Sequence, residues 1–172
     1  ALFRAGAAAG DDIWVSGELG GAALGLARPG IAAAAMRLER PEPRVELGER
    51  LRGLASAAID VSDGFVQDLG HILEKSGVGA VVHYDLLPRS SDLEKLKDEK
   101  LAVNCVLSGG DDYELVFTAK QEARAEIEAL SKDLGLALAR VGNIQKGEPG
   151  VLVLDRDEKP MAVESGFDHF AK

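Results

Sequence analysis

The stretch Ala57-Ala58-Ile59-Asp60-Val61-Ser62-Asp63-Gly64 runs from an apolar strand directly into the start of a helix. A helix is expected from about Gly64 to Lys75, because its apolar residues recur at helical spacing and share one face: Phe65, Leu69, Ile72 and Leu73. Gly77 is the expected helix stop, since glycine readily adopts the left-handed conformation that ends helices. This passage from strand to helix is the unit on which the predicted fold class rests.

The same alternation continues on both sides of this stretch. Strands are expected at 13–17, 78–84, 113–118, 136–144 and 151–155, and helices at 17–25, 31–39, 47–54, 91–100 and 121–134, the last capped by Gly135. The final two strands are expected to pair as an antiparallel hairpin through Gly147-Glu148-Pro149-Gly150. These elements predict an α/β (α+β) fold, a layered domain with a mixed β-sheet flanked by helices.

Composition and charge limit the binding partners that this chain can have. The 172 residues fit one domain and carry a net charge of −9, with no cluster of Lys and Arg that would bind a polyanion, so nucleic acid is excluded as a partner. No apolar stretch has the length of a membrane span, and the single cysteine, Cys105, excludes an intrachain disulfide, so the expected location is the cytoplasm. An acidic protein can still bind phosphates when Mg²⁺ lies between its carboxylates and the ligand.

The first candidate site is Asp60-Val61-Ser62-Asp63-Gly64, between the strand and the helix. Side chains two apart on an extended segment share a face, so Asp60 and Ser62 can point the same way. Asp63 and Gly64 would sit at the helix start, where free backbone N–H groups favour an anion. Carboxylates, a hydroxyl and free amides together suit Mg²⁺-bridged phosphates. Helix capping by Ser62 or Asp63, with Asp60 in a turn, is the structural alternative.

The second candidate site is Ser108-Gly109-Gly110-Asp111-Asp112-Tyr113-Glu114. Its paired glycines permit positive φ angles and a close approach of backbone to ligand, and three acids follow within four residues. A hairpin turn with a solvated acidic flank is the alternative. Arg4 is a third candidate, either as a phosphate contact or as an exposed terminal residue. The histidines, His71, His83 and His169, have no partner at metal-ligand spacing and are interpreted as structural or surface residues.

The ordered set of motifs resembles the thiamine-monophosphate kinase family, within the superfamily of aminoimidazole ribonucleotide synthetase. The similarity extends along nearly the whole chain, and its segments are Arg4–Ala7, Gly10–Gly17, Pro41–Arg44, Ala58–Gly64, Leu107–Leu115 and Gly166–Phe170. The resemblance implies the reaction of ATP and thiamine monophosphate to give ADP and thiamine diphosphate, with Mg²⁺ as the metal. It also implies that Asp60 and Asp63 are Mg²⁺ ligands, and that Arg4 and Ser62 contact the phosphates of ATP.

For the acceptor, the resemblance implies that Glu114 contacts the thiamine moiety and that Phe167 packs against it. No side chain is expected to act as a catalytic acid, base or nucleophile, because the acceptor's own phosphate oxygen is ionised at pH 7. The alternatives that remain are a sister ATP-dependent synthetase, of purine biosynthesis or of selenophosphate, and a non-catalytic binding or assembly module.

Members of the resembled family are roughly twice the length of this chain, as two domains of ordinary size would be. The chain, residues 1–172, is therefore expected to be the C-terminal, substrate- and phosphate-binding domain. The resemblance implies a missing N-terminal domain that binds nucleotide and metal and builds a homodimer. The isolated chain is then expected to be inactive.

Overall fold

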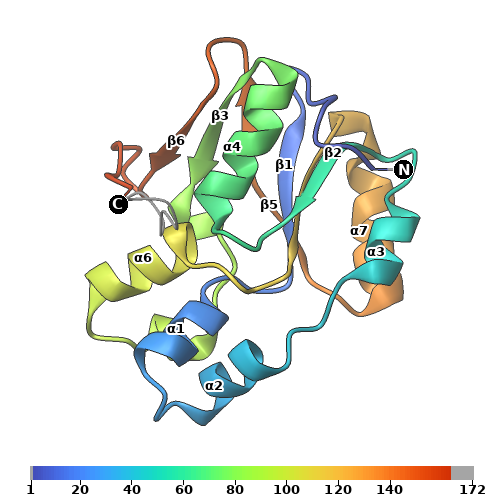
Figure 1. The fold of residues 1–172 in the computed structure, drawn as a ribbon. Coiled ribbons are helices and arrows are strands. Elements are labelled where there is room, and N and C mark those ends of the chain that lie inside the picture. The colour runs from blue at the N-terminus through green and yellow to red at the C-terminus, as the bar shows by residue number, and fades with distance from the viewer. Residues whose placement is uncertain (1, 164–172) are drawn as a thin grey trace.

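The computed structural model describes residues 2–163, and its centre is a six-stranded mixed sheet (Figure 1). The strands are β1 (Asp12–Ser16), β2 (Ala55–Asp60), β3 (Gly79–His83), β4 (Leu115–Ala119), β5 (Leu138–Gln145) and β6 (Gly150–Leu154). They lie in the order β2-β4-β1-β5-β3-β6, with every pair antiparallel except β3 and β6, which are parallel. The predicted mixed sheet in an α/β domain is confirmed.

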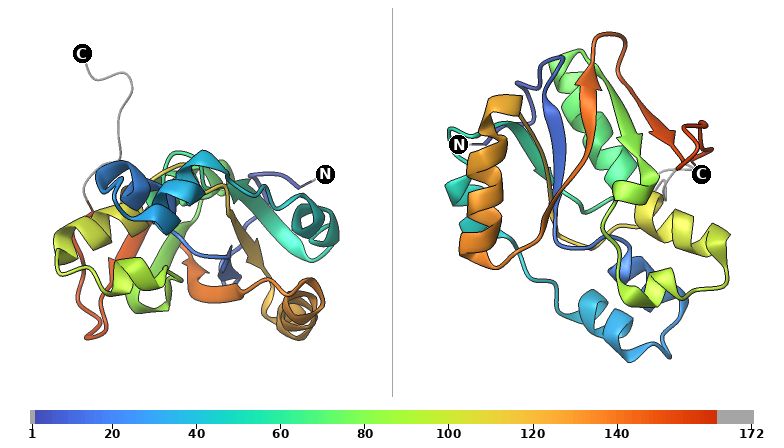
Figure 2. Two further views of the ribbon diagram at one scale, coloured as in Figure 1. Left: turned by 90° about the horizontal axis from the view of Figure 1, so that it is seen from below. Right: turned by 180° about the vertical axis from the view of Figure 1, so that it is seen from behind.

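Helices cover both faces of this sheet and extend from one end of it. They are α1 (Gly21–Ala27), α2 (Ala32–Glu39), α3 (Val45–Arg50), α4 (Phe65–Ser76), α5 (Ser91–Glu94), α6 (Glu99–Ser108) and α7 (Arg124–Leu134), with short 3₁₀ turns at Tyr84–Leu86 and Gln121–Ala123. Helix α7 lies on the face opposite α4, and α1 and α2 form a lobe beyond the end of the sheet (Figure 2).

The core has two parts because successive side chains on a strand point to opposite faces. On β1, Ile13 and Val15 belong to the larger cluster, which includes residues of α4 and α6. Trp14 points the other way and stacks on Phe117, with ring centroids 6.3 Å apart, among apolar residues of α3 and α7. The central strand is therefore buried on both sides.

Two helix ends lie where the sequence predicts them. Gly77 ends α4 with a φ of 65°, and Gly135 ends α7 with a φ of 59°. Both angles are in the left-handed region that glycine adopts without a steric penalty, which is why glycine identifies these ends.

The expected single helix at 91–100 is wrong. Helix α5 ends at Glu94, and α6 starts at Glu99 and continues to Ser108. Two capping residues start these helices separately, since the Ser90 hydroxyl accepts from the Leu93 amide and the Asp98 carboxylate accepts from the Leu101 amide. Local capping therefore divides a segment whose residues are mostly charged.

The expected hairpin of the last two strands is also wrong. Strands β5 and β6 are antiparallel in direction, but β3 lies between them and pairs with both. The turn after Gln145 crosses the start of β3, where a Cβ added to Gly79 would lie 3.1 Å from the carbonyl oxygen of Glu148. Glycine at position 79 leaves room for this crossing, which no local turn signal reveals.

The helices of the described region are short. The longest, α4, has 12 residues, whereas a helix needs about 20 apolar residues to span a bilayer. Within residues 2–163, no helix combines the length and apolar character that crossing a membrane requires.

Candidate functional site

The two candidate sites of the sequence lie side by side in the fold. The ladder between β2 and β4 continues past the strand ends, because the Val61 amide donates to the Glu114 carbonyl at 2.8 Å. The Tyr113 amide donates to the Val61 carbonyl at 2.9 Å, and the Asp111 amide donates to the Ser62 carbonyl at 3.0 Å. Segments 60–64 and 108–114, far apart in the chain, thus form one paired loop system.

Glycines allow these two loops to approach so closely. A Cβ added to Gly64 would lie 2.8 Å from the carbonyl oxygen of Ser108, and one added to Gly110 would overlap the carbonyl oxygen of Ser62. Gly109 is equally restricted, since its Cβ would overlap the Cys105 carbonyl. A side chain at Gly64 or Gly110 would force the two loops apart.

The positive φ angles of the second loop are not where the sequence predicts them. Gly109 has a φ of −73°, whereas Asp111 and Tyr113 have φ angles of 65° and 52°. Positive φ is unusual for Tyr and is maintained only when surrounding structure imposes it. The hairpin alternative is wrong as well, because this loop joins α6 to β4.

The amides at the start of α4 are already occupied. One oxygen of Asp68 accepts hydrogen bonds from the amides of Ser62, Asp63 and Gly64, at 2.9, 2.9 and 3.1 Å. The prediction of free amides for a bound phosphate is therefore wrong at Asp63 and Gly64, where the chain supplies its own anion. The capping alternative is wrong too, because the N-cap is Gly64 and no side chain there makes a capping bond.

Burial of Asp68 opposes its charge. The side chain is buried, and burial raises the pKa of its carboxyl group, while the three amide hydrogen bonds act in the opposite direction. The nearby carboxylate of Asp63 raises the pKa of Asp68 further. Carboxylate oxygens of both residues lie within 4.8 Å of a ring nitrogen of His71, so His71 does have partners at metal-ligand distance.

Asp60 and Asp63 carry the two uncommitted carboxylates of the first loop. Both are exposed, and within residues 2–163 neither carboxylate makes a hydrogen bond or an ion pair. Mg²⁺ prefers oxygen ligands and retains several waters, which suits accessible, uncommitted carboxylates. The group of Asp63, Asp68 and His71 suits it less, because it offers a nitrogen and a carboxylate already bonded to three amides.

Glu114 is buried and holds Arg44 in a two-point ion pair. The Nε and Nη2 atoms of Arg44 donate to the two carboxylate oxygens of Glu114 at 2.8 and 2.6 Å. The hydroxyl of Ser16 donates to the same carboxylate at 2.5 Å, and its oxygen accepts from the Leu115 amide. The hydrogen bond to Glu114 raises the pKa of Arg44, so the guanidinium remains charged. The predicted ligand residue Glu114 therefore has an internal partner 70 positions away.

Asp112 connects the second loop to the α1 lobe. Its carboxylate accepts from the Gly20 amide at 2.6 Å and from the Ala22 amide at 3.2 Å, at the start of α1. Burial raises the pKa of Asp112 to about 6 despite these hydrogen bonds. The acids of this loop thus differ, since Asp111 is exposed while Asp112 and Glu114 serve internal contacts.

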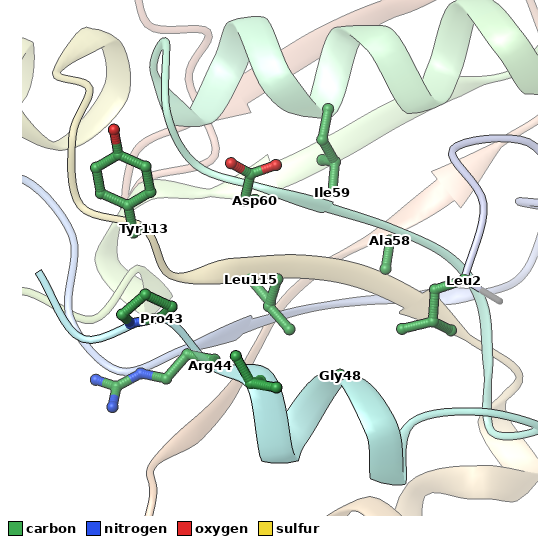
Figure 3. A pocket seen from close by; sticks show the side chains of 10 residues that line it. Leu2, Pro43, Arg44, Gly48, Ala58, Ile59, Asp60, Tyr113 and Leu115 are labelled. Carbon is green, nitrogen blue, oxygen red and sulfur yellow. The ribbon is translucent and has the colours of Figure 1, made fainter.

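A pocket of about 300 Å³ opens beside the paired loops, between α3 and the neighbouring ends of β2 and β4 (Figure 3). Its lining is mainly apolar and consists of Leu2, Pro43, Arg44, Val45, Gly48, Ala58, Ile59, Asp60, Tyr113 and Leu115. The ring of Tyr113 and the carboxylate of Asp60 stand together at one end (Figure 3). The pocket therefore brings residues of both sequence motifs to one opening.

The sequence of this domain matches a known family. Residues 8–155 match the family described as "AIR synthase related protein, C-terminal domain". The chain belongs to this family.

Individual proteins and solved structures are similar to this chain along nearly its whole length. Thiamine-monophosphate kinase of Salmonella typhimurium is 40% identical over 182 residues, which cover 99% of this chain and 56% of that protein. The solved structure of thiamine-monophosphate kinase from Stenotrophomonas maltophilia K279a is 45% identical, with a TM-score of 0.84, over 93% of this chain and 54% of that one. The structure of AaThiL complexed with AMPPCP and TMP is 31% identical, with a TM-score of 0.80, over 98% and 54%. This chain thus spans about half the length of these relatives.

The remaining predicted residues have different outcomes in this AIR synthase related domain. Arg4 is exposed on a segment that runs along β2, where the Ala58 amide donates to the Phe3 carbonyl. Its exposure fits both the phosphate contact and the surface alternative. Phe167 lies outside the described residues, so its predicted contact stays a prediction.

Sequence reasoning missed Arg44 and Asp68, and it placed Asp112 and Tyr113 in the second candidate site without predicting their contacts. An acid in the first turn of α4 was a readable signal for Asp68, because acids favour helix N-termini. The other three have roles that depend on contacts between distant segments, and no local pattern indicates them.

Proposed function

We propose that this chain is the C-terminal domain of a longer cytoplasmic protein that transfers phosphate from ATP to thiamine monophosphate. The support is the 40% and 45% identity to proteins named thiamine-monophosphate kinase, across nearly all of this chain. The relatives are about twice as long, which supports a further, N-terminal domain that binds nucleotide and metal and forms a homodimer. Neither nucleic acid nor a membrane is a partner in this proposal.

The observation that carries the proposal is the position of Asp60 and Asp63 at the paired loops. Their carboxylates are exposed and uncommitted, while the neighbouring acids Asp68, Asp112 and Glu114 are bonded within the fold. We assign Asp60 and Asp63 as Mg²⁺ ligands. When bound, the metal neutralises charge on the phosphates that must approach one another.

The proposed substrate contacts divide between the two substrates. Arg4 and Ser62 contact the phosphates of ATP, and Glu114 and Phe167 contact thiamine monophosphate. The carboxylate of Glu114 already accepts three hydrogen bonds from Arg44 and Ser16, and a carboxylate can accept about four. This leaves about one acceptor position on Glu114, which is 3% exposed.

The chemistry needs positioning more than it needs an acid or base. The nucleophile is a phosphate oxygen of thiamine monophosphate, which is ionised at pH 7 and requires no proton removal. The chain's role is to hold this oxygen in line with the terminal phosphate of ATP, and such positioning lowers the barrier substantially. The absence of a general base in the assignment is consistent with this role.

Asp60→Asn in the longer protein tests the assignment. Transfer of phosphate to thiamine monophosphate should fall by about tenfold or more and recover partly at raised Mg²⁺, because one metal ligand is weakened. Asp157→Asn, at an exposed turn, is the matched control and should leave the rate unchanged. A rate within about threefold of wild type would remove Asp60 from the metal site.

The acceptor is tested separately. The wild-type longer protein should consume ATP with thiamine monophosphate, and not with the acceptors of purine-biosynthetic or selenophosphate synthetases. Turnover with one of those acceptors alone would assign the protein to a sister activity. ATP consumption with none of them, together with thiamine monophosphate binding, would support a binding module.

A further inference from the structure

The backbone of the first loop, residues 60–64, curves around one buried side chain of helix α4. Asp68, in the first turn of α4, is 1% exposed. One of its carboxylate oxygens accepts hydrogen bonds from three successive amides, those of Ser62, Asp63 and Gly64. Successive amides can converge on one oxygen when the backbone curls around it, and such a concavity is also a common way to bind anions. In this chain the concavity encloses a carboxylate of the protein itself.

The curve of this loop is held from two sides. The Ser62 carbonyl accepts from the Asp111 amide at 3.0 Å, which ties the first loop to the second. On the other side, the three amides donate to Asp68. Gly64, between loop and helix, has a φ of 137°, which residues with a side chain rarely adopt. Loss of the Asp68 carboxylate would therefore release this turn on one side and leave three amides without their partner.

The side chains that this curve presents are those of Ser62 and Asp63. Fixing the amide of each residue also fixes the direction in which its side chain leaves the backbone. Asp63 is exposed, and one of its oxygens lies within 4.8 Å of an oxygen of Asp68. Two carboxylates at this distance repel each other, and a cation bound by Asp63 would offset that repulsion. Asp68 thus favours a cation at Asp63 through its charge as well as through its hydrogen bonds.

Asp68 is a poor ligand for Mg²⁺ itself. Mg²⁺ requires nearly octahedral geometry and usually keeps several waters. The Asp68 side chain is buried, and one of its oxygens already accepts three amide hydrogen bonds. Any effect of Asp68 on a bound metal therefore passes through the loop.

We propose that Asp68 is a positioning residue for phosphate transfer, which holds Ser62 and Asp63 in the arrangement that receives phosphate and Mg²⁺. This inference rests on the proposed function, in which Ser62 contacts a phosphate of ATP and Asp63 is a Mg²⁺ ligand. The amides of residues 62–64 are occupied, so the Ser62 hydroxyl and the metal hold the phosphate. The positive end of α4 serves to shape the loop that binds the metal.

Asp68→Asn and Asp12→Asn are matched variants for the test. Asp68 and Asp12 are 1% and 2% exposed, and each carboxylate is bonded within the fold. Asp12 accepts from Arg124 at 2.6 and 2.9 Å, and it pairs with Ala119, at the end of β4 away from the second loop. Both substitutions should lower stability, so a difference in function between them does not come from stability alone.

Steady-state kinetics of the longer protein give the first measurement. Asp68→Asn should lower kcat for phosphate transfer by about tenfold, because its neutral oxygen holds three amides less firmly. The KM for thiamine monophosphate should stay within about threefold of wild type, since the acceptor's contacts are unchanged. Asp12→Asn should leave kcat within about twofold of wild type, with all rates taken per folded molecule.

Binding of the metal alone gives the second measurement. Mg²⁺ is titrated to about 20 mM into the isotope-labelled 172-residue chain at constant ionic strength, while the amide signal of Asp63 is followed by NMR. Asp68→Asn should need about tenfold more Mg²⁺ for half-saturation, and Asp12→Asn should match wild type. If Asp68→Asn fails to fold, Asp68→Glu keeps the anion, moves its oxygens by one methylene group, and should lower kcat and Mg²⁺ affinity by about threefold or more.

The inference would be overturned if the Mg²⁺ affinities of the Asp68 and Asp12 variants agreed within about twofold, or if their kcat values did. Absence of a saturable shift at Asp63 in the wild-type chain would overturn it as well. Failure of the proposed function gives a different result. In that case the wild-type longer protein transfers no phosphate to thiamine monophosphate, while the Mg²⁺ titration still separates Asp68→Asn from Asp12→Asn.

Discussion

Arg44 and Glu114 face each other across 70 residues of sequence and form a two-point ion pair, with N···O distances of 2.8 and 2.6 Å. The pair anchors the segment before α3 to the loop before β4. Both walls of the pocket depend on this link, because Pro43 and Val45 flank Arg44 and Tyr113 and Leu115 flank Glu114. Stability and site geometry are therefore coupled at this point.

Glu114→Gln should lower the free energy of unfolding by about 2–3 kcal/mol, since it breaks a buried ion pair whose Arg partner keeps some access to water. The Arg44 side chain is 22% exposed, which limits the loss. Urea denaturation measures the change. Glu42→Gln is the control, because Glu42 is 83% exposed at 3.4 Å from Arg44, and it should change stability by less than about 0.5 kcal/mol. Equal effects of the two substitutions would contradict the role of burial.

Asp112 should make stability depend on pH in an unusual direction. Burial raises its pKa to about 6 from 3.8, so the folded state binds the proton more tightly than the unfolded state. The penalty for burying the charge therefore appears as pH rises from about 4 to 6 and is fully present above that range. Relative to wild type, Asp112→Asn should gain on the order of 2–3 kcal/mol of stability between pH 4 and pH 7.

Urea denaturation of both proteins across this pH range measures that difference. The control is Asp111→Asn, which changes an exposed neighbour and preserves its left-handed backbone, because Asn tolerates positive φ. Its stability difference from wild type, measured across the same pH range, is the reference with which the Asp112→Asn difference is compared. If the stability difference between Asp112→Asn and wild type did not change with pH, burial would not raise the pKa of the Asp112 carboxyl group.

Asp68→Ala should expose the start of α4 to exchange. Its carboxylate oxygen accepts from three amides, so its removal leaves those donors without a partner and should cost about 2–3 kcal/mol of stability. Amide hydrogen exchange should accelerate at residues 62–64. Ser62→Ala and Asp63→Ala should each cost less than about 0.5 kcal/mol, because neither side chain caps the helix. A larger loss from either would restore the capping interpretation.

Gly17→Ala should disturb Glu114 from the opposite side. Gly17 has a φ of 59°, and a Cβ there would overlap the carboxylate of Glu114. The expected loss is about 3 kcal/mol, combining left-handed strain with displacement of the ion pair. Gly135→Ala has the same φ of 59° with nothing within 4 Å, so it should cost only about 1 kcal/mol. Thermal and urea unfolding of both variants measure the two stability losses, and their difference is the contribution of the overlap with Glu114. Similar losses in Gly17→Ala and Gly135→Ala would show that the overlap contributes nothing.

Features with a local cause were readable from the sequence. The ends of α4 and α7 at Gly77 and Gly135 were predicted correctly, because a glycine after an amphipathic stretch needs no distant partner. The placement of β6 was not, since the insertion of β3 beside it depends on pairing between separate parts of the chain. The prediction of one helix at 91–100 was wrong for another reason. The residue types there favour a helix, but Asp98 caps a second helix, α6, that starts within the segment.

The candidate site shows the same division. Both acid-rich motifs were found from residue type and spacing, yet their pairing through Val61 and Tyr113 required the structure. Sequence reasoning treated Glu114 and the amides after Asp60 as available to ligands. The structure gives each an internal partner, Arg44 and Asp68, and such partners cannot be inferred without knowing which segments meet.

The strand order has a consequence for how the chain forms during synthesis. No two neighbouring strands of the sheet are consecutive in sequence, and the first strand, β1, is flanked by β4 and β5. Asp12 pairs with Ala119 on one side and with Asn143 on the other, so β1 leaves the ribosome about a hundred residues before either neighbour exists. Nascent chains that end before Leu115 must keep an apolar central strand unpaired, which makes this interval the one in which a chaperone would matter most.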